Sequence, residues 1–254
     1  MELTILGSGT TSPHPTRGSS GFWLETARGS IMLDLSATAF HRAAREGFDW
    51  ANLDAIWISH FHLDHVGGLA PFLFGTKYAF ETQARTKTMR IFAPEGLREL
   101  LEKFDSAYDY GIFTQPFPLE ITEVKADSSF EILPYVKADT YSTQHTPESL
   151  ALKINDGEKT FVFTSDTGSD AKLGEFAKDC DLLLTESSFV EKSPIPVHIG
   201  FPESIELVNI AKPKNAVFTH FYSVWDGVDF KEKTTKYATP CEITEAVDGL
   251  RITV

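Results

Sequence analysis

The sequence predicts an α+β fold in which β-sheets pack together and helices cover their outer faces. Short apolar and β-branched runs of about five to seven residues alternate with turn signals, and helical patterns lie between them. The chain has 254 residues, of which 42% are hydrophobic, so it is long enough to bury a substantial core. No stretch rich in proline, glycine and serine divides it, and we therefore expect one domain spanning residues 1–254.

The first half and the middle of the chain are expected to be mainly strands. Helical spacing of apolar residues predicts helices at 38–46, which Gly47 would end, at 69–82, and at 95–107, where one face is apolar. β-branched and apolar runs predict strands at 2–6, 21–25, 30–35, 53–59, 89–93, 119–124, 130–135, 150–154 and 160–163.

The remaining part of the chain continues the alternation of helices and strands. Two helices are expected at 171–178 and 202–211, and buried strands at 182–185 and 216–219. A last strand is expected at 250–254. Interspersed helices of this kind are typical of sheets that are covered on their outer faces.

The charge balance and the cysteines limit the function classes. There are 36 acidic and 23 basic side chains, giving a net charge of −13, which argues against a general nucleic-acid binder with a broad basic face. Cys180 and Cys241 lie far apart and neither forms a CxxC pair, so a disulfide framework or a cysteine zinc site is disfavoured. No apolar run suits a signal peptide or a membrane span, and we expect a cytoplasmic protein without membrane partners.

Residues 59–69 read SHFHLDHVGGL and concentrate metal-ligand types. At the end of a strand, residues i and i+2 project to the same side, so His60 and His62 can bind one ion. Asp64 and His65 follow where the chain turns into a helix, and they can face a second ion. Burying so many imidazole and carboxylate groups without metal would cost much free energy. The motif therefore predicts a metal site.

Three later positions complete a candidate dinuclear site. Asp166 and His220 each lie just beyond an apolar strand-like run, and His145 lies in a polar turn. Each position is weak evidence alone. With the first motif they make a set of five histidines and two aspartates.

Together these residues resemble the ordered motifs of the metallo-β-lactamase superfamily, including Asp34 in the segment LDL at 33–35. The resemblance spans nearly the whole chain and implies a four-layer αββα sandwich, in which two packed mixed β-sheets are flanked by helices and the metals lie at one edge. It implies that Asp34 orients the site from behind the ligands. Carried onto this sequence, one metal would be bound by His60, His62 and His145, the other by Asp64, His65 and His220, and Asp166 would bridge both.

Several details resemble the phosphodiesterase branch of the superfamily, which includes ribonuclease Z and the small cyclic-phosphodiesterases of phosphonate metabolism. The segments LTILGSGT at 3–10 and HTPES at 145–149 are similar to that branch. His198 precedes His220 by 22 residues, and the branch has a catalytic, non-ligand histidine at a matching separation. The resemblance therefore implies that His198 is catalytic.

One feature of ribonuclease Z has no counterpart here. Those enzymes grip transfer RNA with a protruding basic arm rich in glycine and proline, and the interval from His65 to His145 contains no such hairpin. The nearest substitute is the stretch 76–90, where Glu81 opposes Lys77, Arg85, Lys87 and Arg90. An ordinary solvated helix face and loop is the more probable interpretation. We therefore expect a small anionic phosphodiester as substrate, with RNA as a less favoured partner.

The implied reaction uses a metal-bridging hydroxide as nucleophile at neutral pH. Asp64 and Asp166 would hold and orient that nucleophile, while His198 would donate a proton to the phosphate or to its leaving oxygen. Imidazole and carboxylate ligands without thiolate suit two Zn²⁺ ions, with Mn²⁺ or Fe²⁺ as alternatives. Phe221, Tyr222 and Trp225, just after His220, could line the mouth of the site.

Three alternative functions remain open at this point. A lactone or thioester hydrolase would use the same metal ligands, and a tRNA 3′-processing endoribonuclease would use the same phosphodiester chemistry. A non-catalytic metal-binding scaffold would be marked by a missing ligand, and none is missing. The branch also implies a homodimer.

Overall fold

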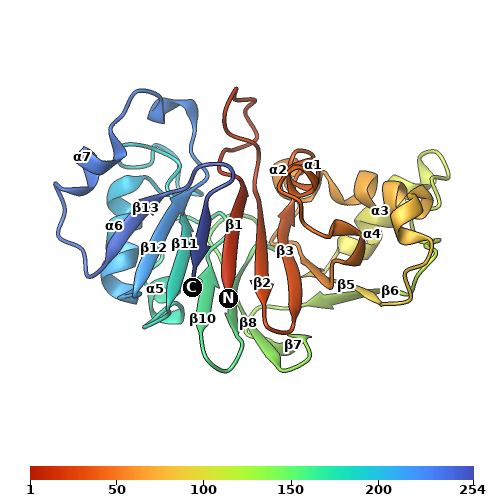
Figure 1. The fold of residues 1–254 in the computed structure, drawn as a ribbon. Helices are drawn as coiled ribbons and strands as arrows, with labels where there is room; N and C mark the ends of the chain where they lie inside the picture. Colours follow the sequence, from red (N-terminus) through yellow and green to blue (C-terminus); the bar gives the residue numbers. More distant parts are fainter.

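The computed structural model of the chain describes residues 1–254 and contains two mixed sheets of seven strands each (Figure 1). The strand order is β14-β1-β2-β3-β4-β5-β6 in the first sheet and β13-β12-β11-β10-β9-β8-β7 in the second. In each sheet one half is antiparallel and the other parallel: β3 to β6 run parallel in the first, and β10 to β13 in the second. The expected pair of packed mixed sheets is confirmed.

The strands have the following bounds. The first sheet comprises β1 (Glu2–Gly7), β2 (Gly21–Thr26), β3 (Gly29–Leu35), β4 (Ala55–Trp57), β5 (Met89–Pro94), β6 (Leu119–Val124) and β14 (Arg251–Thr253). The second comprises β7 (Ser129–Leu133), β8 (Val136–Ser142), β9 (Leu150–Asn155), β10 (Thr160–Phe163), β11 (Leu182–Glu186), β12 (Asn215–Thr219) and β13 (Glu242–Glu245). Because β14 pairs with β1, the two chain termini lie close together (Figure 1).

Alternation along the strands builds two separate apolar layers. In β2, Phe22 and Leu24 face the core between the sheets, where Phe22 packs against Phe163 of the second sheet. The intervening Trp23 faces the other way and joins the layer beneath the helices. A strand that is buried on both faces reads as a continuous apolar run, which is what the sequence of β2 shows.

Helices cover both outer faces, which confirms the four-layer arrangement. On one side, Ala43, Leu73 and Leu101 are buried residues of a first group of helices, α1 to α4. On the other side, Leu173 and Val208 are buried residues of a second group, α5 and α6. Figure 1 shows the first group beside β3 to β6 and α5 and α6 beside β11 to β13. The helices are α1 (Ala39–Arg45), α2 (Leu63–Val66), α3 (Leu69–Tyr78), α4 (Leu97–Ser106), α5 (Ala171–Phe176), α6 (Phe201–Ala211) and α7 (Phe230–Thr234), with short 3₁₀ turns η1 (Trp50–Asn52), η2 (Phe80–Thr82) and η3 (Ser223–Trp225). None of these helices combines the length and apolar character needed to cross a bilayer.

Some element boundaries differ from those expected. The helix expected at 69–82 ends at Tyr78, because Ala79 has extended backbone and the Thr82 hydroxyl bonds to the carbonyl oxygens of Thr76 and Ala79. The strand expected at 53–59 is only Ala55–Trp57, since the chain beyond it leaves the ladder to form the site. The sequence analysis did not predict β8, β13 or α7.

Candidate metal centre

The candidate ligands gather at one edge of the sandwich, at the carboxyl ends of parallel strands. The segment 59–65 follows β4, Asp166 follows β10 and His220 follows β12. His145 comes from the turn between β8 and β9, next to this edge. Parallel strands place their carboxyl ends side by side, and this edge of an open sheet is a general location for ligand sites.

The first group of donors consists of His60, His62, His145 and Asp166, whose ligand atoms all lie within 4.8 Å of one another. The Nε2 atom of His145 lies 2.9 Å from Nδ1 of His62. The rings of His62 and His145 are each 4.8 Å from the ring of His60, measured between centroids. Three imidazoles and one carboxylate thus converge on one point, as a divalent ion with nitrogen and oxygen ligands requires.

The second group consists of Asp64, His65 and His220. Oδ2 of Asp64 lies 3.7 Å from Nε2 of His65 and 3.5 Å from Nε2 of His220. His65 is fully buried, and Asp64 and His220 are nearly so. The helix turn α2 carries Asp64 and His65 together, which is the placement expected from the sequence.

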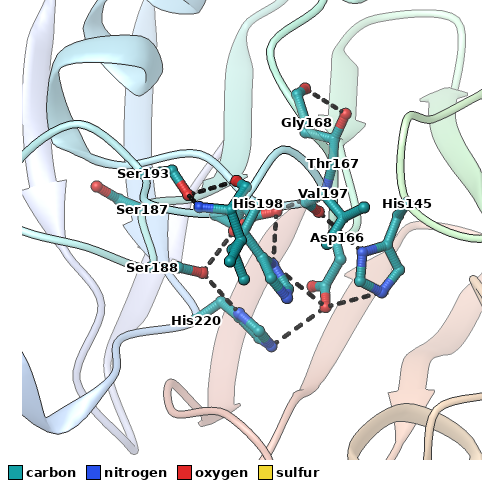
Figure 2. A network of polar contacts seen from close by, with 12 residues as sticks. His145, Asp166, Thr167, Gly168, Ser187, Ser188, Ser193, Val197, His198 and His220 are labelled. Atoms are coloured by element: carbon teal, nitrogen blue, oxygen red, sulfur yellow. Dashed lines mark hydrogen bonds and ion pairs between the residues drawn. The ribbon is translucent and has the colours of Figure 1, made fainter.

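Asp166 lies between the two groups (Figure 2). Its Oδ2 atom is 3.3 Å from Nε2 of His65 and 3.3 Å from Nε2 of His220. The same oxygen is 3.7 Å from Nε2 of His145 and 3.9 Å from Nε2 of His60. One carboxylate is therefore within reach of histidines from both groups.

The donor chemistry fits divalent metal ions. The Nε2 atoms of His60, His65 and His220 are buried, and none has a hydrogen-bond partner. Buried polar atoms are normally paired, because an unpaired one loses its hydration without compensation. Three unpaired imidazole nitrogens beside buried carboxylates are satisfied when they bind metal.

The other ring nitrogen, Nδ1, of His65, His145 and His220 contacts a second polar group. Nδ1 of His65 donates to Oδ2 of Asp34 at 2.6 Å, and Nδ1 of His145 donates to the Val197 carbonyl at 2.9 Å. Nδ1 of His220 lies 3.0 Å from the Ser188 hydroxyl. Such contacts fix the ring orientation and leave Nε2 free to bind a metal ion.

Asp34 anchors the first motif at three points. Besides His65, it accepts hydrogen bonds from the backbone amide of Ser59 at 2.7 Å and from the Ser59 hydroxyl at 2.9 Å. Its backbone is left-handed, with φ of 54°, a conformation that costs free energy in a residue other than glycine. The structure thus places Asp34 behind His65 and in contact with Ser59.

The buried charges shift several pKa values. Burial, with the charge of His65, holds the pKa of His60 well below its ordinary value. Burial also opposes protonation of His65, but the carboxylates of Asp166 and Asp34 outweigh it and raise the pKa of His65 well above its usual range. For Asp166, burial is outweighed by His220 and His65, which hold its pKa well below normal.

His198 lies beside this cluster and contacts an acidic partner. Its Nδ1 atom is 3.1 Å and 3.2 Å from the two carboxylate oxygens of Glu186 and 3.9 Å from Oδ2 of Asp166. Burial lowers the pKa of His198, but the hydrogen bond and charge of Glu186 outweigh that effect and raise the pKa to about 9. A ligand atom of His198 also lies within 4.8 Å of those of Asp166 and His220.

Glu186 is a residue of this site that the sequence analysis missed. It is the last residue of β11, is almost fully buried, and also accepts hydrogen bonds from the Thr167 amide and the Ser188 hydroxyl. The strand was expected to end at Thr185. The signal that could have indicated Glu186 was its position as a carboxylate directly after the run LLLT. Asp166 was identified from a similar position after β10.

Of the three aromatic residues expected to line the mouth of the site, the structure leaves only one partly exposed. Phe221 and Trp225 are buried, and Nε1 of Trp225 donates to the Ser187 carbonyl, so these two side chains belong to the core and the prediction was wrong for them. Tyr222 is only partly buried and lies beside His198 and His220. An open depression of about 600 Å³ is lined in part by His145, Gln144 and Val197.

Comparison with known proteins shows which family this sequence matches. The family model described as "Anti-Pycsar protein Apyc1" matches residues 1–239. The chain is 24% identical over 273 residues to ribonuclease Z of Nitrosopumilus maritimus (strain SCM1), covering 87% of this chain and 89% of the relative. It is 26% identical over 247 residues to the probable metallo-hydrolase YhfI of Bacillus subtilis (strain 168), covering 92% and 93%.

A solved structure agrees in fold. The crystal structure of the metallo-β-lactamase fold protein YhfI from Bacillus subtilis superposes with a TM-score of 0.80 at 21% identity, covering 99% of this chain and 98% of that one. The match therefore extends over both sheets and both helix layers. Since the family model also spans nearly the whole sequence, this chain belongs to the anti-Pycsar protein Apyc1 family and has the metallo-β-lactamase fold.

Proposed function

We propose that this chain is a metal-dependent phosphodiesterase that holds two divalent ions. One ion would be held by His60, His62 and His145, the other by Asp64, His65 and His220, with Asp166 shared between them. The name of the relative ribonuclease Z supports hydrolysis of a phosphoester, and that of the probable metallo-hydrolase YhfI supports metal-dependent hydrolysis. The observation that carries the choice of a phosphodiester is the Glu186–His198 pair, with Nδ1 of His198 only 3.9 Å from the shared carboxylate.

The bound ions would supply a hydroxide nucleophile near neutral pH and neutralise charge on the phosphoryl oxygens. Asp166 lies between the two groups of histidines and Asp64 contacts His65 and His220, so both carboxylates are placed where they can orient the nucleophile. The ligand set contains nitrogen and oxygen but no thiolate, which suits Zn²⁺ and also permits Mn²⁺ or Fe²⁺.

His198 would act as the acid. Glu186 occupies its Nδ1 atom, so the proton on Nε2 remains to be donated to the phosphate or to the leaving oxygen. Glu186 favours the protonated imidazole, because a neighbouring negative charge stabilises the cation. The leaving group of the diester would therefore lie on the His198 side of the centre.

The basic side chains of the stretch 76–90 favour a small diester over a large RNA. In the stretch 76–90, Arg85 is buried and its guanidinium donates only to backbone carbonyls. Lys87 pairs with Asp54, and Nε of Arg90 lies 3.6 Å from a carboxylate oxygen of Glu120. These basic groups are already occupied, and RNA affinity depends mainly on free Lys and Arg side chains.

An endoribonuclease acting on the 3′ end of precursor transfer RNA is the second candidate, favoured by the ribonuclease Z relatives. Metal-loaded protein should be incubated with precursor transfer RNA and, separately, with cyclic nucleotides and small diesters. We expect turnover of small diesters. Cleavage of precursor transfer RNA alone would instead support the nuclease.

A carbon-centred ester is the remaining enzymatic alternative, because a lactone or thioester would use the same ligands. Parallel assays of bis-p-nitrophenyl phosphate, a lactone and a thioester separate the classes. We expect hydrolysis of the phosphodiester; faster turnover of the lactone or thioester would contradict the proposal. No turnover of any substrate by fully metal-loaded protein would favour a non-catalytic scaffold.

Two further assignments accompany the proposal. Cys180 and Cys241 are both free thiols, which suits a reducing compartment, and we propose the cytoplasm. The resemblance to the phosphodiesterase branch leads us to propose a homodimer. Light scattering of the purified chain measures this directly.

A further inference from the structure

Tyr222 lies at the edge of the metal centre but takes no part in the roles assigned so far. It follows His220 by two residues, and its ring centroid is 6.2 Å from that of His220 and 6.3 Å from that of His198. The ring is nearly perpendicular to both imidazoles, at 88° and 82°. Tyr222 thus borders the ligand histidine and the proposed acid at the same time.

Phe189 holds this ring in place. The two rings are stacked, with centroids 5.2 Å apart and planes 13° from parallel. The backbone amide of Tyr222 donates to the Ser188 carbonyl at 3.3 Å, and the Phe189 carbonyl accepts from the amide of Phe201 at 2.8 Å. The segment that carries Phe189 also carries Ser188, and the segment that leads to Phe201 carries His198. The aromatic pair is therefore fixed relative to the candidate metal centre.

The side chains of Tyr222 and Phe189 are partly exposed to solvent. Tyr222 and Phe189 are each of intermediate exposure, whereas their neighbours Phe221 and Trp225 are buried. The structure gives the Tyr222 hydroxyl no hydrogen-bond partner. A rigid aromatic surface therefore remains available to a molecule bound beside His198.

We propose that Tyr222, braced by Phe189, is a positioning residue whose ring packs against the leaving group of the phosphodiester. This inference rests on the proposed function, in the form in which His198 protonates the leaving oxygen and that oxygen lies next to it. A group attached to that oxygen then lies beside Tyr222. Aromatic surfaces attract flat rings more than puckered ones of similar size, so the site favours a flat leaving group.

The test compares two phosphate monoesters that resemble the bound leaving side, phenyl phosphate and cyclohexyl phosphate. They match closely in size and charge, and differ in flatness. Inhibition constants against hydrolysis of bis-p-nitrophenyl phosphate and calorimetric affinities are measured for the wild type and for Tyr222→Leu, Tyr222→Phe and Phe189→Leu. Calorimetry does not depend on turnover.

We expect the wild type to bind phenyl phosphate more tightly than cyclohexyl phosphate. Tyr222→Leu should weaken the binding of phenyl phosphate by about 3- to 10-fold and remove most of the preference. Tyr222→Phe should retain the preference, and Phe189→Leu should lose part of it. For the diester, Tyr222→Leu should raise KM more than it lowers kcat, with metal content unchanged.

An unchanged preference in Tyr222→Leu, or an equal loss in Tyr222→Phe, would overturn the inference. So would a wild type that binds both monoesters equally well. If the wild type hydrolyses no diester and binds neither monoester, the proposed function itself fails. Tyr222→Phe retains the ring, so it tests the proposal even if Tyr222→Leu folds poorly.

Discussion

Both carboxylate oxygens of Glu186 face Nδ1 of His198, at 3.1 Å and 3.2 Å. Glu186 is itself held by the Thr167 amide and the Ser188 hydroxyl, so its carboxylate has no freedom to turn away. Because Ser188 also contacts Nδ1 of His220, one chain of polar contacts joins the proposed acid to a proposed ligand. Figure 2 shows His198 and His220 near each other, with Ser188 in contact with His220.

Replacing His198 with alanine should reduce turnover strongly. Loss of a general acid typically costs about 100- to 10,000-fold in rate. The ligand residues remain, so the metal content measured by elemental analysis should be unchanged. His198→Ala that retains full turnover of bis-p-nitrophenyl phosphate would remove the role of His198.

Glu186→Gln keeps the side-chain size but removes the charge that favours protonated His198. Turnover should fall by about 10-fold, a usual cost for losing such a supporting contact. Because Glu186 acts through His198, the double variant should be no slower than His198→Ala alone. Additive losses in the double variant would show that Glu186 acts independently.

The sequence predicted where several candidate ligand residues gather because of how parallel strands are built. A polar residue soon after a buried apolar run lies at the carboxyl edge of the sheet, as His220 does directly after β12 and Asp166 does shortly after β10. The fold class and the close grouping of His60, His62, Asp64 and His65 followed from patterns within short segments. Local patterns were therefore sufficient for these features.

The supporting contacts could not be predicted in the same way. Glu186 reads as the polar end of a strand, and only the three-dimensional fold brings it to His198. Phe221, Tyr222 and Trp225 lie within five residues of one another, and nothing in their order shows that only Tyr222 remains partly exposed. The strand β8 alternates buried and exposed residues but includes Lys137 and Asp139, which hid it from an apolar-run criterion.

Arg85 should be a stabilising residue. Its guanidinium donates to the carbonyls of Ala51 and Leu53 at 2.7 Å and 2.8 Å, and the side chain is 5% exposed. Arg85→Met leaves buried carbonyls unpaired and should lower the free energy of unfolding by about 3 kcal/mol.

Arg90→Met is the matched control, because Arg90 is more exposed and should change stability by only about 0.5 kcal/mol. Urea unfolding followed by circular dichroism measures both variants. Equal losses in the two variants would contradict the assignment of Arg85 to the fold.

Asp181 should stabilise the fold in a pH-dependent manner. Burial opposes its ionisation, but a hydrogen bond from Lys214 at 2.7 Å and one from the Thr160 amide at 2.8 Å outweigh it and lower the pKa. A carboxyl with a lowered folded pKa stabilises above its unfolded pKa, and this contribution is lost as the pH falls through the folded value.

Asp181→Asn should therefore lower the free energy of unfolding by about 1 to 2 kcal/mol at pH 7. Below about pH 4 the free energies of unfolding of the variant and the wild type should become more similar. Asp179→Asn is the control, because Asp179 is exposed and asparagine tolerates its left-handed backbone. Thermal unfolding across this pH range measures both. A difference in stability between Asp181→Asn and wild type that stays constant with pH would show that the charge of Asp181 is not what stabilises the fold.

Stepwise reconstitution of metal-free protein decides whether two ions drive phosphodiester hydrolysis. Zn²⁺ or Mn²⁺ is added in known amounts, and turnover of bis-p-nitrophenyl phosphate is measured with the bound metal per chain. We predict that turnover rises until about two ions are bound per chain and then stops rising. Full turnover at about one ion per chain, or turnover that persists in metal-free protein, would contradict the dinuclear centre.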